Sequence, residues 1–235
     1  MQLFYNKTIQ QGDVDFTFDK QESKHIVRVL RKTEGDILTI TNGLGSLFIC
    51  EVILASDKKC RVQIKEVQQH TNERKYRLHI AIAPTKLNDR LEWFLEKATE
   101  IGVDEISPII CDHSERKVIK HERMEKIIHA AAKQSLKYHF PVLNPAIKLS
   151  EFLATKKTGN LLIAHCEETD KKSLKSVLKE SENYTILIGP EGDFSTKEIA
   201  LALLHKYIPV SLGTSRLRTE TAGIVAVHSI AFANE

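Results

Sequence analysis

Two stretches near the C-terminal end decide how this chain folds: IGPEGDF, residues 188–194, and SLGTSRLRTETAG, residues 211–223. Each follows a short apolar run and precedes a segment with helical spacing of apolar residues, so each is predicted to be a loop at the carboxyl end of a strand. In an open parallel sheet, ligands bind at these carboxyl ends. The two loops are therefore candidates for one ligand site.

The side chains in these loops suit such a site. Glycines let the backbone approach a ligand closely. The glycines are Gly189, Gly192 and Gly213. The charged residues beside them are Glu191, Arg218 and Glu220. Thr219 is expected to cap the last helix, whose N-terminus favours an anion. One such loop alone is more often an ordinary turn, whereas two at neighbouring strand ends favour a site.

Outward from these loops, the second part of the chain alternates between strand and helix patterns. Strands are predicted over 78–83, 106–111, 161–164, 185–188 and 208–212. Helices are predicted over 88–101, 123–137, 171–182, 195–206 and 220–233. Asn88 and Gly102 supply the expected start and stop of the first helix. This alternation predicts an α/β fold with a parallel sheet.

The first 75 residues differ, because apolar and polar residues alternate there with the period of a half-buried strand. Four such runs are separated by turn residues, and one helix is expected over 20–30. Several short strands with tight turns predict a small β-barrel. The polar stretch QQHTNERK, residues 68–75, is predicted to be the linker. The expected domains are residues 1–70 and 76–235.

Composition sets the broad class. The 235 residues are 42% hydrophobic and 28% charged, which excludes a disordered, collagenous or disulfide-stapled chain. No run of about 18 apolar residues and no signal peptide is seen, so no membrane span is expected. The cysteines are scattered and predicted to be free thiols in a reducing cytoplasm, at Cys50, Cys60, Cys111 and Cys166.

Several common catalytic motifs are missing. The sequence has no GxGxxG after the first strand of its second part, no GxxxxGK[ST] and no GxSxG. These absences argue against a Rossmann dinucleotide site, a P-loop and an α/β-hydrolase nucleophile. The histidines form no HExxH pattern, so no metal is expected.

A local excess of cations raises the question of a polyanion partner. Between Arg116 and Lys137, seven Lys and Arg residues face only Glu122 and Glu125, although the whole chain carries a net charge of only +3. The segment is either a nucleic-acid footprint or a solvated helix face, and charge alone does not choose between them.

The two loops resemble the C-terminal signature of the SPOUT methyltransferases. Within that superfamily they resemble the family that methylates N3 of a uridine in small-subunit ribosomal RNA. Weaker matches extend over nearly the whole chain: HIVRVLR at 25–31, Lys86, KATEIGVDEISP at 97–108, and Ser114-Glu115-Arg116 with Gln134-Ser135. The chain departs from the family at Asp193, where glycine is usual, and at Arg216, where an apolar residue is usual.

The resemblance implies a C-terminal SPOUT domain whose parallel sheet is tied in a trefoil knot, and an N-terminal PUA-like RNA-binding β-barrel. It implies S-adenosylmethionine as cofactor, 16S ribosomal RNA or the small subunit as partner, and a homodimer. The cofactor-binding candidates are Ile188, Gly189, Glu191, Gly192, Leu212, Gly213, Leu217 and Thr221. The RNA-binding candidates are Arg28, Arg31, Arg116, Lys117 and Arg123.

The implied reaction transfers a methyl group in line to the uracil nitrogen. Arg218 is the candidate for stabilising the imide anion that forms as N3 loses its proton. Glu191 and Glu220 are candidates for a base or for orienting groups. The alternative for Arg218 is a structural ion pair with one of these carboxylates. The alternative for the whole protein is an RNA-binding module without catalysis. A phosphate-ligand enzyme is disfavoured, because Glu191 and Asp193 would repel phosphate.

Overall fold

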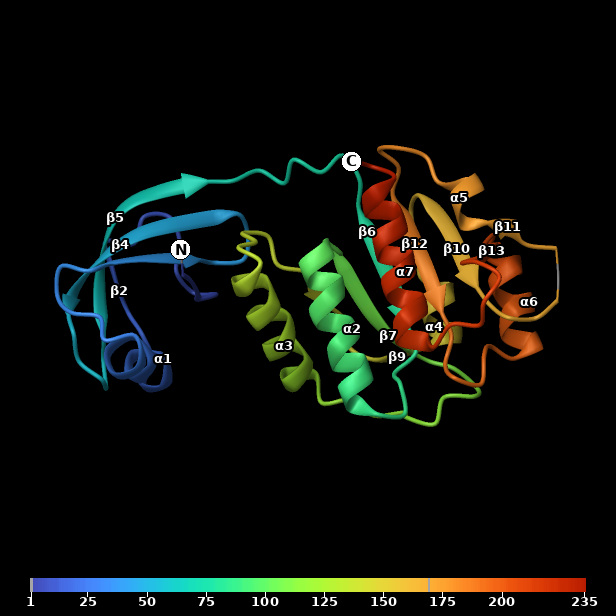
Figure 1. The fold of residues 1–235 in the computed structure, drawn as a ribbon, viewed down its shortest axis with the longest axis horizontal. Coiled ribbons are helices and arrows are strands. Elements are labelled where there is room, and N and C mark those ends of the chain that lie inside the picture. Colours follow the sequence, from blue (N-terminus) through green and yellow to red (C-terminus); the bar gives the residue numbers. More distant parts are fainter. Residues whose placement is uncertain (1, 169) are drawn as a thin grey trace. The chain divides into compact units, whose positions relative to one another are not determined.

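The computed structural model describes residues 2–168 and 170–235. The chain divides into two compact units (Figure 1). The first comprises the residues up to 73 together with 132–140, and the second comprises residues 74–131 and 141–235. The chain therefore returns once to its first unit after entering the second.

The first unit is a curled five-stranded sheet in the order β1-β3-β4-β5-β2. Its strands are β1 (Leu3–Tyr5), β2 (Asp15–Thr17), β3 (Ile37–Thr41), β4 (Ser46–Leu54) and β5 (Arg61–Gln69). β1 pairs with β3 in parallel and the other pairs are antiparallel. No pairing between β1 and β2 is found among the described residues, so the five strands curl around their core without a closed ladder. This is the PUA-like sheet that the sequence predicted.

A short helical segment packs on this sheet. α1 (Lys20–Lys24) is capped by Asp19, whose side chain accepts a 2.8 Å hydrogen bond from the Glu22 N–H. It continues as a π-helical turn, η1 (His25–Val29). Ile26 of this turn is fully buried in the core of the unit with Phe4 and Phe48. The predicted helix over 20–30 is therefore present, with a π-helical second half.

Residues 132–140 complete the first unit. The Gly45 N–H donates to the Tyr138 carbonyl at 2.9 Å, and the Phe140 N–H donates to the Gly43 carbonyl at 2.9 Å. The Phe140 ring stacks on Tyr5 with 4.6 Å between ring centroids. Gly43 and Gly45 have φ of 75° and 94°, and a Cβ at Gly45 would lie 2.5 Å from the His139 ring. Glycine is required there by both backbone angle and space.

The second unit contains a wholly parallel sheet in the order β11-β13-β10-β12-β6-β7-β8, with β9 also pairing with β7. Its strands are β6 (Leu78–Ile82), β7 (Glu105–Ile110), β8 (Val142–Leu143), β9 (Ile147–Lys148), β10 (Asn160–Ala164), β11 (Lys172–Ser173), β12 (Tyr184–Ile188) and β13 (Ile208–Ser211). The predicted α/β class with a parallel sheet is confirmed.

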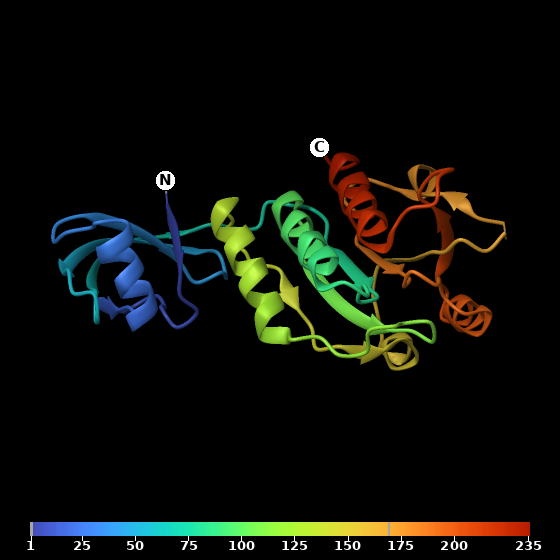
Figure 2. The same ribbon diagram turned by 60° about the horizontal axis from the view of Figure 1, so that its bottom comes forward.

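Helices cover both faces of this sheet (Figures 1 and 2). They are α2 (Asn88–Ile101), α3 (His121–Gln134), α4 (Leu149–Ala154), α5 (Leu174–Val177), α6 (Thr196–Leu204) and α7 (Thr219–Phe232). Alternate residues of β6 serve the two cores, as a strand period of two requires. Ile80 and Ile82 pack with α2 and α7, whereas Ala81 and Ala83 pack with α4 and α6.

The C-terminal helix returns across the sheet. After β13 the chain runs to α7, which packs on α2 and on β6 and β12. Because β10 separates β13 from β12 in the strand order, the last segment passes the end of β10 to reach this place. The trefoil knot implied by the resemblance stays a prediction.

The helix ends show where local signals decided the structure. Ser195 forms a capping box with Glu198 at the start of α6, and Gly102 ends α2 with φ of 128°. The N-cap of α2 is Leu87, not the expected Asn88. The predicted helix over 171–182 is wrong: only 174–177 is helical, because 172–173 pairs with β13 and the Tyr184 hydroxyl binds the backbone N–H and carbonyl of Lys179.

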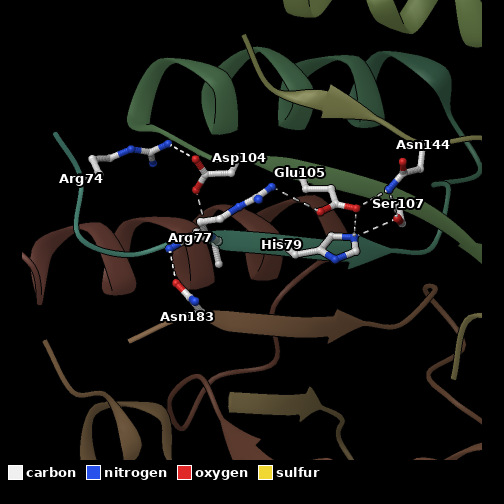
Figure 3. Close-up of polar contacts among 9 residues, drawn as sticks. Arg74, Arg77, His79, Asp104, Glu105, Ser107, Asn144 and Asn183 are labelled. Carbon is white, nitrogen blue, oxygen red and sulfur yellow. Dashed lines mark hydrogen bonds and ion pairs between the residues drawn. The ribbon is translucent and has the colours of Figure 1, made fainter. Parts of the chain in front are cut away.

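The amino ends of β6, β7 and β12 carry a polar network (Figure 3). His79 Nε2 shares a 2.8 Å hydrogen bond with the Ser107 hydroxyl, which also accepts 2.8 Å from the Asn144 amide. Arg74 pairs with Asp104, whose carboxylate also accepts 2.8 Å from the Leu78 N–H. The polar groups named in this network satisfy one another.

No helix among the described residues is long and apolar enough to cross a membrane. All four cysteines are free thiols, as predicted, and only Cys166 is exposed. Burial raises the pKa of the Cys50 thiol to about 12, which keeps it protonated and unreactive.

Candidate functional site

A cavity lies where the carboxyl ends of β10, β12 and β13 meet. It has two adjoining parts of about 480 and 360 Å³. Together these lie within the size range of small-molecule sites. Three loops line them: 164–166 after β10, 188–193 after β12 and 211–219 after β13. The two loops predicted from the sequence are thus joined by a third.

The loops after β12 and β13 are bonded directly to each other. The buried Thr219 hydroxyl donates a 3.0 Å hydrogen bond to the Gly189 carbonyl. Thr219 is therefore the first residue of α7 rather than its cap, and Arg218 occupies the cap position with no capping side-chain bond. A Cβ at Gly189 would lie 3.0 Å from the Phe194 ring. A side chain at this position would therefore press against Phe194 instead of entering open space.

Gly213 is the glycine that faces the cavity. It has φ of 137°, and a Cβ built there meets nothing within 4 Å. Gly213 lines the larger part of the cavity with Leu212 and Leu217. A side chain here would combine an unfavourable backbone angle with entry into the cavity.

The third loop contributes a buried histidine that the sequence analysis missed. His165 is 7% exposed, and neither ring nitrogen has a hydrogen-bond partner in the described part of the chain. Burial, and secondarily the Lys171 charge, hold the pKa of His165 below its ordinary value, so the ring is neutral at neutral pH. A neutral imidazole offers one donor and one acceptor, and here both are unpaired and buried beside the cavity. This loop contains no glycine, so spacing and turn residues do not identify it.

Asp193 ties this loop to the one after β12. Its Oδ2 accepts 2.7 Å from the Cys166 N–H, and its Oδ1 accepts 2.9 Å from the Phe194 N–H. Its φ is 63°, in the left-handed region that favours glycine. Aspartate tolerates this region because its short side chain bonds the local backbone. The glycine usual in the resembling family would fit the same backbone.

The three charged candidates lie in different surroundings. Arg218 is exposed and lines the smaller part of the cavity, and its guanidinium forms no hydrogen bond or ion pair with a described residue. Glu191 lines the same part and accepts 2.9 Å from the Lys86 N–H. Glu220 is 6% exposed, lies 3.8 Å from Arg90 Nε and does not line the cavity. The alternative in which Arg218 pairs with either carboxylate therefore has no support.

Most cofactor candidates line the cavity. Those that do are Ile188, Gly189, Glu191, Leu212, Gly213 and Leu217. Gly192 and Thr221 do not. The Gly192 carbonyl instead accepts a 3.1 Å hydrogen bond from His113 Nδ1. Other lining residues that the sequence analysis did not single out are Ala164, Cys166, Lys171, Pro190 and Ala222.

The arginines among the RNA candidates are mostly engaged within the chain. Arg28 pairs with Asp57 at 2.7 Å, and Arg123 pairs with Glu92 at 2.7 Å. Arg116 donates to backbone carbonyls. Arg31 is exposed and has φ of 55°.

Lys117 belongs to a different group of cations. With Lys148 and Lys197 it lines a separate cavity of about 410 Å³ near the carboxyl end of β7. All three lysines are exposed, and none forms an ion pair with a described residue. The cavity also contains Asp112 and Glu198, and the Glu198 carboxylate accepts from the N–H groups of Asp112 and Ser195 at 2.9 Å each. The lysine charges are therefore not neutralised by direct pairing. Within the described ranges, no group of His, Cys, Asp and Glu is placed to hold a metal ion.

Comparison with known proteins identifies the family. A family model described as an RNA methyltransferase domain matches residues 72–231, and one described as an RNA methyltransferase PUA domain matches residues 18–65. The ribosomal RNA small subunit methyltransferase E of Rickettsia conorii is 30% identical over 210 residues, covering 88% of this chain and 84% of the relative.

Two solved structures agree over the full length. A probable rRNA-methyltransferase from Porphyromonas gingivalis has a TM-score of 0.92 and 43% identity, covering 100% of this chain and 98% of that one. A putative methyltransferase from Legionella pneumophila, in complex with the cofactor SAM, has a TM-score of 0.89 and 28% identity, covering 99% and 97%. The matched domain models and the similarity over nearly the whole chain show that it belongs to the ribosomal RNA small subunit methyltransferase E family of RNA methyltransferases.

Proposed function

We propose that this protein uses S-adenosylmethionine to methylate N3 of a specific uridine in 16S ribosomal RNA. The observation that carries the proposal is the cavity at the carboxyl ends of β10, β12 and β13. There the buried His165 ring and the Arg218 guanidinium have no partners among the described residues. The name of the Rickettsia relative supports the small-subunit RNA as substrate, and the choice of uridine N3 follows from the family resemblance.

The residues present fit this cofactor. Its polar groups need donors and acceptors, which the His165 ring and the backbone of the three loops supply. Its adenine ring needs apolar walls, which Leu212, Leu217 and Ala222 provide. Because Gly213 has no side chain, the space beside its backbone stays open for the ligand. When bound, S-adenosylmethionine supplies a methyl group already activated on a sulfonium, so the protein need not activate it further.

The protein's own task is to position the uracil and to handle the N3 proton. Positioning alone is worth several kcal/mol when a reactive geometry is held. Arg218 can donate two hydrogen bonds to a uracil carbonyl and stabilise the charge that develops as N3 is deprotonated. Glu191, held on one oxygen by the Lys86 N–H, is the candidate to accept or relay the proton. Glu220 is buried beside Arg90, and we assign it to holding the start of α7.

The uridine must be unpaired to enter such a site. We propose that the N-terminal PUA-like unit binds RNA and that Lys117, Lys148 and Lys197 contact phosphates near the site. We further propose a homodimer in which each subunit helps to build the other's site. The mass in solution, measured by light scattering, tests this assembly, and a monomer at all concentrations would contradict it.

Two measurements together test the function. Calorimetry with S-adenosylmethionine should show one site per chain. Small subunits from cells lacking the protein should accept one methyl group per 16S RNA, at a uridine that then blocks reverse transcription because its pairing edge is methylated. RNA binding without cofactor binding would instead favour the non-catalytic RNA-binding module. Methyl transfer to a different atom would preserve the enzyme and refute the assigned position.

A further inference from the structure

We propose that Arg116 is a positioning residue, which sets the Glu191 carboxylate at the cavity through the peptide group between Thr85 and Lys86. The proposal concerns the site of the proposed function and rests on it. It changes the role of Arg116 from an RNA contact to an internal one. The contacts that carry it all lie among the loops following β6, β7 and β12.

The first contact joins Glu191 to the loop after β6. Glu191 Oε1 accepts a 2.9 Å hydrogen bond from the Lys86 N–H. No second hydrogen bond or ion pair of this carboxylate is found within the described part of the chain, although the Lys86 ammonium is near enough to interact with its charge. One oxygen is thus fixed by the backbone and the other is left for a ligand. The position of the Glu191 carboxylate therefore depends on the orientation of the Lys86 N–H.

The second contact aims that N–H. Arg116 Nε donates to the Thr85 carbonyl at 3.0 Å. The Thr85 carbonyl and the Lys86 N–H belong to one peptide group, which is planar and trans, so they point in opposite directions. This peptide group therefore lies between a guanidinium on its carbonyl side and a carboxylate on its N–H side. A cation bonded to the carbonyl polarises the group and strengthens the N–H as a donor.

Further contacts hold the same loop. Arg116 Nη2 donates to the Lys86 carbonyl at 2.6 Å, and Nε also reaches it at 3.2 Å. The Lys86 ammonium pairs with Glu115 at 2.9 Å, and this hydrogen bond is the main reason that the pKa of Lys86 is raised. Because that pair is exposed, it adds little, and the Arg116 fork is the main tether. Lysine cannot reproduce the fork.

Arg116 is accordingly a poor candidate for a phosphate contact. Its guanidinium is only partly exposed and is directed at two carbonyls of its own chain. Lys117, the next residue, is exposed and lines the lysine cavity instead. Adjacent residues thus serve different partners, which charge counting along the sequence cannot resolve.

The experiment combines hydrogen exchange with a double-mutant cycle on the full chain. Exchange of the Lys86 amide is measured by NMR in wild type, Arg116→Gln, Arg116→Lys and Glu191→Ala. Loss of one hydrogen bond in an exposed loop should speed exchange by about tenfold in each variant. Arg123→Gln is the matched control, because Arg123 pairs with Glu92 and touches no part of this loop, and it should leave Lys86 exchange unchanged.

The single-turnover methylation rate then tests the consequence. Arg116→Gln should lower the rate about tenfold in the wild-type background and less than about twofold in the Glu191→Ala background, because the two act through one path. The salt dependence of RNA binding should not move. Equal rate losses in both backgrounds, or a lower salt slope with Lys86 exchange unaltered, would overturn the proposal. Absence of methylation by the wild type would refute the proposed function, and the exchange measurement would still decide the role of Arg116.

Discussion

The two edges of the parallel sheet treat their polar groups in opposite ways. At the amino edge, His79, Ser107 and Asn144 bond one another, and Asp104 is bonded from two sides (Figure 3). At the carboxyl edge, neither nitrogen of the buried His165 nor the Arg218 guanidinium has a partner among the residues that the structure describes. The two histidines are equally buried, at 7% exposed each.

From this difference we propose that the network at the amino edge stabilises the fold and that the groups at the carboxyl edge bind the ligand. An unpaired buried polar group costs about 1–3 kcal/mol, so a fold does not retain one without a reason. In a polar network whose donors and acceptors are all paired with one another, none is left to bind a ligand. The strand-end rule alone names the carboxyl edge, and the unpaired His165 ring agrees with it. Hydrogen-bond satisfaction by itself does not single out this edge, because the buried Tyr207 hydroxyl, just before β13, also lacks a partner among the described residues.

The largest expected effect follows from Gly213→Val. The substitution combines strain at φ of 137° with a side chain in the cavity, so S-adenosylmethionine affinity measured by calorimetry should fall about 100-fold or more. Gly35→Val is the matched control, because Gly35 has φ of 89°, has open space around its Cβ and lies in the first unit. Both variants should lose similar stability and only the first should lose the cofactor. Normal affinity in Gly213→Val would move the site.

Arg218 gives the next effect, on rate rather than on binding. Arg218→Lys keeps the charge but loses the two-pronged donor, so the single-turnover rate should fall about tenfold or more, with Arg218→Ala worse. Cofactor affinity and melting temperature should stay near wild type, because no described residue bonds the guanidinium. Arg216→Lys, two residues away on the same loop, is the control. Parallel losses of affinity and stability in Arg218→Ala would show a structural role.

Substitutions of His165 and His79 should have opposite effects on stability and on cofactor affinity. His165→Phe removes an unpartnered polar ring, so stability should hold while cofactor affinity falls about tenfold. His79→Phe breaks the bond to Ser107, so stability should fall by about 1–3 kcal/mol while cofactor affinity holds. Chemical denaturation and calorimetry on both variants measure the four quantities. A loss of stability in His165→Phe equal to that in His79→Phe would remove the distinction between the edges.

Protonation of His79 should lower the stability of the fold between pH 6.5 and about 4. Burial lowers the pKa of His79 to about 4 from its ordinary value of 6.5. Below pH 6.5 the unfolded chain binds a proton that the folded chain does not, so stability present above 6.5 is lost as the pH falls toward 4, by up to about 1.4 kcal/mol per pH unit. His79→Phe should be flatter across this window in denaturation curves. An unchanged slope would show that His79 is protonated in the fold.

The smallest effect concerns the lysine cavity. Replacing Lys117, Lys148 and Lys197 with glutamine should lower the log–log salt slope of RNA binding by at most about one unit per lysine. The control replaces Arg28 and Arg123, whose guanidinium groups are paired, and should change the slope less. A slope that moves only in the control would place the RNA contacts on the arginines.

Periodicity and turn chemistry predicted the sheet, most helices and two of the three site loops. They failed where distant contacts override local preference. The segment 171–182 has helical spacing, yet pairing with β13 and the Tyr184 hydroxyl stop the helix after four residues. The short elements β8, β9 and α4 carry too few residues for a pattern to be seen.

The sequence predicted only those loops of the candidate site that contain glycine, which are the loops after β12 and β13. His165 follows a strand without any such signal, and only burial together with missing partners reveals it. Charge counting placed Arg116 and Lys117 together, although one bonds backbone carbonyls and the other is exposed. Tertiary structure determines where a side chain points and which partner it binds. The spacing of residues along one sequence does not reveal either.

The return of residues 132–140 to the first unit bears on how the protein is made. A chain leaves the ribosome N-terminus first, and domains generally fold as they emerge. The five strands of the first unit have all emerged once residue 69 is out, yet Tyr5 and Gly45 still lack Phe140 and Tyr138. The unit therefore matures only after residues 74–131, which belong to the other unit, have been synthesised. Translation cannot deliver the two units strictly one after the other, and a truncation after residue 73 keeps all five strands but loses the segment that bonds Gly43 and Gly45 and stacks on Tyr5.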